Sequence, residues 1–347
     1  MRAGQKPMRN WKKFYMKSKK WRIFWIFCGG IILCFLIGLM SFCLGTIYFS
    51  PLKVIRLLLG KGDRIERSIL LYARLPRTLA ALFSGAALAV SGAVLQTVLG
   101  NRLASPGIIG VNAGAGLGVT LCLAAGIYSG LAISGAAFLG SLITVFLIFL
   151  FSYRTNAAKT TVILGGVALN SIWNAVAESV TVLDPEVGTL SIDFRVGGFS
   201  AVSYARLIPA IILISLALTV MFTLCNELDV AALGDETALS LGMAVKKYRL
   251  IFLLLCALLS GAAVSFAGLL GFVGLIVPHF VRKFSGNESR RLLPLTALFG
   301  AGFVTFCDTF SRLIFAPYEL PVGILMSVIG GPVFFWMLVR SRHSINQ

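Results

Sequence analysis

Residues 74–118 read RLPRTLAALFSGAALAVSGAVLQTVLGNRLASPGIIGVNAGAGLG, and the prediction of the fold starts from this stretch. Its run 78–99 is mainly apolar and long enough to cross a bilayer at about 1.5 Å per residue. Gln96 lies near the end of that run, and a buried amide needs a hydrogen-bond partner inside the bundle. Small residues recur four positions apart, a spacing that lets helix backbones approach closely in lipid: Gly85 and Ala89, then Gly114 and Gly118.

The composition is that of a polytopic membrane protein. Of the 347 residues, 58% are hydrophobic and only 13% are charged, whereas soluble domains carry about 25% charged residues. The net charge of +18 would suit nucleic acid, but Lys and Arg gather in the N-terminal tail and between apolar runs. This pattern indicates a membrane surface and no nucleic-acid partner. The seven cysteines lie almost entirely inside apolar runs without a CxxC pair, so we expect small buried hydrophobic residues rather than disulfides or metal ligands.

Apolar runs predict about ten transmembrane helices with both chain ends in the cytoplasm. The first span, 23–44, follows a tail (1–22) that holds nine Lys or Arg residues, and no clean cleavage site follows it. The positive-inside rule places that tail in the cytoplasm, and an even number of spans places residues 341–347 there too. The boundaries near 265–285 stay open. The other spans are expected at 77–100, 108–126, 130–152, 160–182, 206–225, 248–268, 270–283, 291–313 and 321–340.

A single permease domain, 23–340, is expected between the two tails. Its outer segments are 45–76, with a short helix from Ser50-Pro51, and 183–205, with a short helix and a turn. The sizeable polar stretch on the cytoplasmic side is 226–248, which Gly234 and Gly242 should divide into short helices.

Three blocks of sequence carry a family resemblance. They are RLPR to the NRLA-PG segment (74–107), LGDETALSLG (233–242), and GFVGLIVPH (271–279) followed by Asp308, Arg312 and ELPVG (319–323). From about Arg74 to Arg340 the chain therefore resembles the permease subunits of the iron-siderophore and vitamin B12 (type II, FecCD-like) ABC importers. Arg102 stands where that family usually has proline.

The resemblance implies that 226–248 is a coupling loop that seats in an ATP-hydrolysing subunit. On polarity alone, a solvated loop is the alternative. No GxxxxGK[ST] phosphate-binding motif occurs, so we expect no catalytic site and no bound cofactor in this chain, with ATP and Mg²⁺ on the partner ATPase. The predicted coupling residues are Leu233, Gly234, Asp235, Glu236, Leu241 and Gly242.

Arginines at the predicted outer helix ends are the candidate docking residues. By resemblance, Arg74, Arg77 and Arg312 would face acidic residues of a soluble substrate-binding protein, a task that suits the bidentate guanidinium. The alternative is that they extend to the lipid headgroups. Asp308 and Arg312 lie four residues apart and should pair, and Glu319 should start the last helix on the outer side.

Polar residues at a spacing of four mark one face of the 160–182 span. Asn170, Asn174 and Glu178 would line the translocation path in the family, although a polar stripe buried in the bundle remains the alternative. With only His279 and His343 present, a His-rich iron site is excluded, and we expect no metal site.

The expected function is import of an iron chelate, a ferric siderophore first, with heme or cobalamin as alternatives, across the cell membrane by alternating access. The expected partners are a second permease copy or a paralogue, two cytoplasmic ATPase subunits and an extracytoplasmic binding protein. An ion-driven secondary carrier would need midplane ionisable residues and an internal repeat, and neither is evident. A receptor or scaffold is disfavoured only by the resemblance. The chelate, the homodimer or heterodimer choice and the envelope type stay open.

Overall fold

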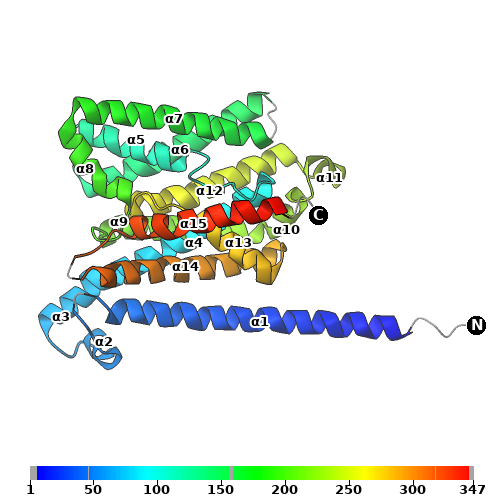
Figure 1. Ribbon diagram of the computed structural model, residues 1–347, viewed down its shortest axis with the longest axis horizontal. Coiled ribbons are helices and arrows are strands. Elements are labelled where there is room, and N and C mark those ends of the chain that lie inside the picture. Colours follow the sequence, from blue (N-terminus) through cyan, green and yellow to red (C-terminus); the bar gives the residue numbers. More distant parts are fainter. Residues whose placement is uncertain (1–5, 46, 156–158, 317, 344–347) are drawn as a thin grey trace, which may run out of the picture.

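The computed structural model describes residues 6–45, 47–155, 159–316 and 318–343, and these form an all-helical bundle (Figure 1). In chain order the elements are α1 Lys6–Cys43, α2 Pro51–Leu58, α3 Arg64–Ser68, the π-helix η1 Ile69–Arg74, α4 Leu75–Val98, α5 Val111–Ala124, α6 Gly130–Thr155, α7 Lys159–Leu183, α8 Pro185–Val196, α9 Tyr204–Thr223, α10 Cys225–Ala231, α11 Asp235–Ser240, α12 Val245–Ala267, α13 Val273–Ser285, α14 Ser289–Ile314 and α15 Val322–His343.

Each predicted span coincides with a helix. Within the described residues, seven helical segments are long and apolar enough to cross a membrane, and two shorter apolar helices accompany them, Val111–Ala124 and Val322–Met337. The first helix differs from the prediction, because α1 begins at Lys6 and so includes most of the predicted basic tail. Residues 1–5 and 344–347 of the two predicted tails lie outside the described residues.

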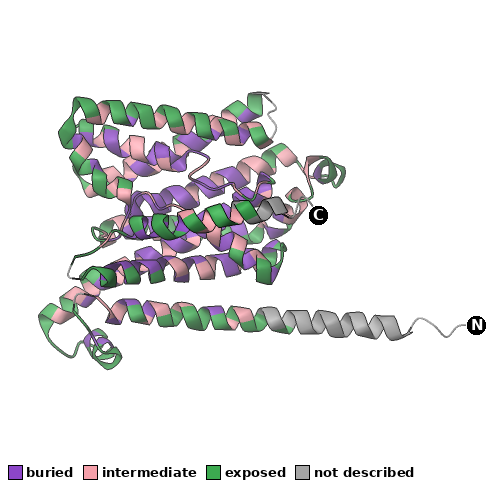
Figure 2. Ribbon diagram, in the orientation of Figure 1, coloured by how far each residue is buried: buried purple, intermediate pink, exposed green. Residues whose placement is uncertain are grey.

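Helix α4 lies at the centre of the bundle. In the apolar window of α4, 78% of the residues are buried inside the chain, against 17% for α7. Figure 2 shows the same gradient, with buried residues on α4 and α12 and exposed residues along α1 and α7 at opposite edges. A helix buried on all sides must pack closely against several neighbours, so small residues are required on more than one of its faces.

Glycine pairs produce that close packing. A side chain at Gly85 would collide with the backbone of Gly300 on α14, and one at Gly92 would collide with Gly274 on α13. The same relationship joins Gly114 on α5 to α6. Gln96 bridges the contact between α4 and α13, where its amide donates to the Gly274 carbonyl oxygen at 3.1 Å. The predicted roles of the small residues and of Gln96 are thus confirmed.

The two ends of the bundle differ. The short helices α2, α3 and α8 lie at one end, and α10 and α11 lie at the other, where α1 also begins and α15 ends (Figure 1). Ser50 caps α2 by accepting the backbone N–H of Lys53 at 3.3 Å, at the place where Ser50-Pro51 predicts a helix start. These are named the α2–α3 end and the α10–α11 end below.

The predicted boundary between spans near 265–285 is a non-helical segment, 268–272. Gly268 and Phe272 both adopt positive φ, at 70° and 65°, which stops α12 and redirects the chain into α13. The backbone of this segment is paired with the end of α8, since Leu269 N–H donates to the Phe194 carbonyl oxygen at 2.9 Å. That pairing satisfies backbone groups inside the bundle that a lipid environment would leave without partners.

Candidate functional site

A polar cavity lies along α7, between α5, α8 and the loop that precedes α5. Its volume is about 470 Å³. The predicted path residues Asn170, Asn174 and Glu178 all line it. Two further polar side chains, Asn112 of α5 and Arg195 of α8, complete the polar lining. The structure therefore brings the predicted polar stripe of α7 together at one cavity.

Asn170 also positions the wall of this cavity. Its Nδ2 donates to the carbonyl oxygens of Gly107 at 2.9 Å and Ile108 at 3.3 Å, which ties the loop before α5 to α7. Gly110 takes a φ of 91° as the chain turns from this loop into α5. A Cβ on Gly166 would lie 2.9 Å from the Ile108 carbonyl oxygen, so α7 and the loop are in direct contact.

The outward side of α7 carries polar side chains among apolar ones. Asn174 and Glu178 are both exposed in the isolated chain, together with Ser171 and Ser179. An ionised carboxylate at the centre of a bilayer costs about 2.5–3.5 kcal/mol on insertion scales. The part of α7 around Asn174 and Glu178 is therefore better suited to water or to another protein surface than to acyl chains.

The predicted coupling residues form a compact element at the α10–α11 end of the bundle. Gly234 and Gly242, with φ of 98° and 82°, delimit α11 as predicted. Glu236 is exposed, and three apolar side chains on or beside α11 are between 58% and 62% exposed: Leu233, Leu239 and Leu241. An exposed apolar cluster next to an acidic residue is typical of a protein-contact surface.

Asp235, unlike its neighbour Glu236, is engaged inside the chain. One carboxylate oxygen accepts from Lys159 Nζ at 3.1 Å and the other accepts from Arg249 Nη2 at 2.5 Å. Lys159 is the first residue of α7 and Arg249 lies in the first turns of α12. Asp235 therefore joins α11 to two membrane helices, and we call these three residues the Asp235 clamp.

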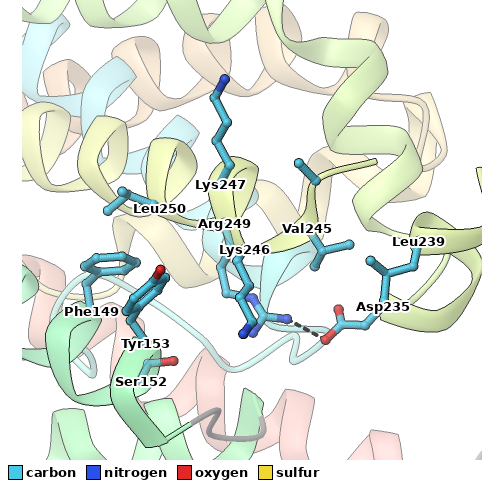
Figure 3. A pocket seen from close by; sticks show the side chains of 11 residues that line it. Phe149, Ser152, Tyr153, Asp235, Leu239, Val245, Lys246, Lys247, Arg249 and Leu250 are labelled. Carbon is cyan, nitrogen blue, oxygen red and sulfur yellow. Dashed lines mark hydrogen bonds and ion pairs between the residues drawn. The ribbon is translucent and has the colours of Figure 1, made fainter. Parts of the chain in front are cut away.

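The clamp borders an open pocket of about 860 Å³ between the end of α6, α11 and the start of α12. Figure 3 shows Asp235 and Arg249 facing each other across one side of this pocket, with Tyr153 and Phe149 on the other. Burial alone would raise the pKa of Asp235, but the hydrogen bonds from Arg249 and Lys159 outweigh it and hold the pKa below its usual value. The clamp is therefore charged at neutral pH.

A second anchor fixes the other half of the coupling element. The side-chain oxygen Oδ1 of Asp229 on α10 accepts the backbone N–H of Ser289, the first residue of α14, at 2.9 Å. A carboxylate at a helix N-terminus satisfies an otherwise unpaired N–H group and interacts favourably with the helix dipole. Together, Asp229 and Asp235 tie α10 and α11 to three of the long helices.

A buried ion cluster occupies the α2–α3 end, between α4 and α14. Arg77 donates to both carboxylate oxygens of Asp308, at 3.0–3.2 Å, and to Glu319 at 2.6 Å. Arg312 lies on the other side of Asp308, at 3.2 Å, and the predicted pairing of these two residues is thus confirmed. The Asp308 side chain is fully buried.

None of the three predicted docking arginines is freely exposed: Arg74 and Arg312 are buried, and the Arg77 side chain is 13% exposed. Arg74 is buried, donates to the carbonyl oxygens of Phe42 and Ile47, and lies over the Phe49 ring at 4.4 Å from its centroid. Arg312 is buried and donates to Ser41 Oγ at 2.8 Å. The expectation of an exposed rim formed by both residues is corrected accordingly: each guanidinium has its partners inside the chain. A docking role for them stays a prediction.

Several site residues were missing from the sequence prediction. The sequence alone assigns no role to Lys159 and Arg249 of the clamp or to Asn112 and Arg195 of the cavity. The signal in the sequence was weak but real: Asn112 is a single amide in an apolar run, and Lys159 is a cation at the start of a span. Among the described residues, no three His, Cys, Asp or Glu side chains gather as metal ligands would.

Comparison with known proteins gives the family. The FecCD transport family matches residues 31–340. The chain belongs to that family. The FecCD chain is 32% identical over 341 residues to the iron(3+)-hydroxamate import permease FhuG of Bacillus subtilis, covering 94% of this chain and 100% of the relative.

Further relatives and a solved structure agree. The vitamin B12 import permease BtuC of Vibrio cholerae is 34% identical over 318 residues, covering 89% of the FecCD chain and 94% of the relative. The hemin permease HmuU of Yersinia pestis is 37% identical over 280 residues, covering 78% and 83%. A metal-chelate type ABC transporter in an inward-facing conformation superposes with a TM-score of 0.82 at 28% identity, covering 91% and 99%.

This membership settles the class of protein. The FecCD chain is a multi-pass membrane permease of the ABC transporter type, and its family consists of transport permeases rather than enzymes.

Proposed function

We propose that this chain is the transmembrane subunit of an ABC importer that carries a ferric siderophore through a path along α7. Separate ATPase subunits would drive it by alternating access, and about ten helices would cross the membrane with both chain ends in the cytoplasm. The single observation that carries the proposal is that α7 holds both parts: Lys159 of the Asp235 clamp at its start, and Asn170, Asn174 and Glu178 at the cavity.

Helix α7 offers a rigid mechanical link between the two parts. Lys159 and Asn170 lie eleven residues apart, which corresponds to about 16 Å along a helix. The carboxylate of Asp235 on α11 forms an ion pair with Lys159 on α7. A displacement of α11 by a docked ATPase would therefore move α7 along its length. Asn170 would transmit that movement to the loop at Gly107, which also lines the cavity.

The coupling surface would be the exposed side of α11. Leu233, Leu239 and Leu241 supply apolar contact area, and Glu236 supplies a charge outside the clamp. Asp235 would act by holding α11 in place, since each of its oxygens pairs with a cation of another helix.

A second permease copy or a paralogue would complete the path. The exposed polar face of α7 cannot be solvated by lipid at acceptable cost, and opposing a second such face would enclose a water-filled channel. Glu178 and Asn174 would then lie on the channel wall.

The substrate-binding protein would dock at the α2–α3 end. With Arg74 and Arg312 engaged internally, Arg77 and Glu319 at the rim of the ion cluster are the docking candidates nearest to the surface, with side chains 13% and 35% exposed. Exposed cations on α2, α3 and the turn between them extend this surface: Arg56, Lys61, Arg64 and Arg67.

The substrate assignment rests on the relatives. Their names record hydroxamate siderophore, vitamin B12 and hemin transport, so a ferric siderophore is proposed first and heme or cobalamin second. Cells that depend on this chain for import would be given each radiolabelled compound in turn. Uptake of ferric hydroxamate alone supports the first assignment, and uptake of heme or cobalamin alone replaces it.

The clamp provides the test of mechanism. Lys159→Ala, Asp235→Ala and the double variant would be compared with the unaltered chain for ferric siderophore uptake at matched membrane abundance. We expect each single variant to reduce uptake severalfold and the double variant to be no worse than the singles, because both disrupt one contact. Uptake that is equal in all variants and persists without ATPase subunits would favour an ion-driven carrier.

A further inference from the structure

A basic pocket lies at the α10–α11 end, apart from the path cavity and from the Asp235 clamp. It encloses about 250 Å³ between the end of α4 and the end of α13. Arg102, His279, Arg282 and Lys283 line it, and no carboxylate does. Amides of Gln96 and Asn287 and the backbone of Gly286 complete the described lining.

The positive charges of this pocket are not neutralised. Among the described residues, Arg102, Arg282 and Lys283 make no ion pair. Arg102 and Arg282 repel each other electrostatically across the pocket. Cations gathered around a cavity without a counter-charge favour the binding of an anion.

Arg282 is held in place for such a contact. Its Nη2 donates to the Ala93 carbonyl oxygen at 3.1 Å and to Thr97 Oγ1 at 3.0 Å, which fixes the guanidinium against α4. Its Nε–H is buried and has no acceptor among the described residues. A buried donor without a partner costs about 1–3 kcal/mol, so an external acceptor would relieve that cost.

The surroundings of the pocket resemble a membrane interface. Phe280 and Phe284 on α13 are about half exposed and stack edge to face, with ring centroids 4.9 Å apart. Trp336 on α15 lies beside Lys283, whose ammonium is 5.8 Å from the ring centroid. Aromatic rings at headgroup level and a basic pocket between helices are the features by which membrane proteins hold anionic lipid headgroups.

We infer that Arg102, His279, Arg282 and Lys283 form a phosphate-binding site, with the headgroup of an anionic phospholipid as its favoured occupant. A volume of 250 Å³ has room for a phosphate group with several waters, since a liquid water occupies about 30 Å³. The site does not depend on the transport proposal.

The test uses the full-length permease purified in a neutral detergent. Thermal unfolding would be followed while short-chain phosphatidylglycerol is titrated in, with phosphatidylcholine as the neutral lipid, and separately with inorganic phosphate against chloride at equal ionic strength. We expect phosphatidylglycerol to raise the melting temperature saturably. Arg102→Pro, which removes a charge from a turn outside the helices where proline is tolerated, is expected to weaken the apparent affinity about fivefold.

Two further variants, and the comparison of phosphatidylglycerol with inorganic phosphate, distinguish the possible outcomes. Lys283→Gln should weaken binding as Arg102→Pro does, whereas Lys61→Ala, an exposed cation in the turn after α2, should leave it unchanged. Stabilisation by phosphatidylglycerol alone assigns a lipid headgroup, and stabilisation by inorganic phosphate as well assigns a free phosphate site. No saturable response to either, or equal responses in wild type and Arg102→Pro, would overturn the inference.

Discussion

Arg77 on α4 and Asp308 on α14 lie 231 residues apart in the chain, yet the guanidinium of Arg77 donates to both carboxylate oxygens of Asp308. Arg312 approaches the same carboxylate from within α14. One fully buried Asp therefore pairs with two largely buried arginines between α4 and α14, and Glu319 supplies a second negative charge to Arg77.

Asp308→Asn is expected to be strongly destabilising, because it leaves Arg77 and Arg312 without their shared counter-charge. Breaking a buried ion pair from one side costs about 3–5 kcal/mol. Thermal unfolding in detergent and the abundance of folded protein in membranes would both fall. Glu319→Gln is the matched control, since its side chain is 35% exposed and such pairs contribute up to about 1 kcal/mol. A melting temperature for Asp308→Asn equal to that of wild type would contradict this account of the cluster.

The close contact of Gly85 on α4 with Gly300 on α14 gives a second prediction. Gly85→Ala would place a Cβ against the backbone of Gly300, which cannot yield as a side chain can, so we expect a loss of about 1–3 kcal/mol from overpacking. Gly135→Ala on α6 is the control, because a Cβ at that position would have no neighbour within 4 Å and the variant gains the same helix propensity. Comparing the two melting temperatures isolates the steric effect. If both alanines behave alike, the helices are not in contact at Gly85.

Local patterns predict the helices well. A hydrophobic run is a local property of the sequence, and all ten predicted spans coincide with helices. Gly234 and Gly242 likewise mark the turns around α11. The spacing of Asn170, Asn174 and Glu178 correctly indicates a shared face, since they line one cavity.

Long-range pairing is what the sequence leaves undetermined. Nothing near Asp235 indicates that Lys159, 76 positions earlier, is its partner, and nothing near Arg77 indicates Asp308. Such pairs are set by how helices cross, which depends on packing among distant segments. The burial of Arg74 and Arg312 has the same origin, because their partners lie at the end of α1.

The Asp235 clamp should be insensitive to pH over the physiological range. Its carboxyl has a pKa below the usual value in the folded protein, so its stabilising contribution is complete above the unfolded pKa of about 3.9 and is lost only as pH falls through the folded value. The melting-temperature difference between wild type and Asp235→Asn should therefore stay constant from pH 8 to about pH 5. We would measure both proteins in one buffer series. A difference that disappears between pH 7 and pH 5 would show that the pKa of this carboxyl is not depressed.

The last prediction concerns the access of water to the cavity along α7. If the polar face of α7 lines an aqueous path, a cysteine at position 174 should react with a membrane-impermeant maleimide, because thiolate formation requires water. The experiment uses a variant in which the seven native cysteines are replaced, so that only the introduced cysteine can react. Asn174→Cys is compared with Ile212→Cys on α9, an exposed apolar position 54% accessible in the isolated chain and expected to face lipid.

We expect Asn174→Cys to label at least severalfold faster than Ile212→Cys in membranes, although both side chains are accessible in the isolated chain. The contrast separates exposure to water from exposure to lipid. Labelling of Asn174→Cys should also slow when the transporter is trapped with its cavity closed, since the two states differ in access to α7. Equal and slow labelling at both positions would place the polar face of α7 in a dry protein contact, and the path would then have to be sought elsewhere in the bundle.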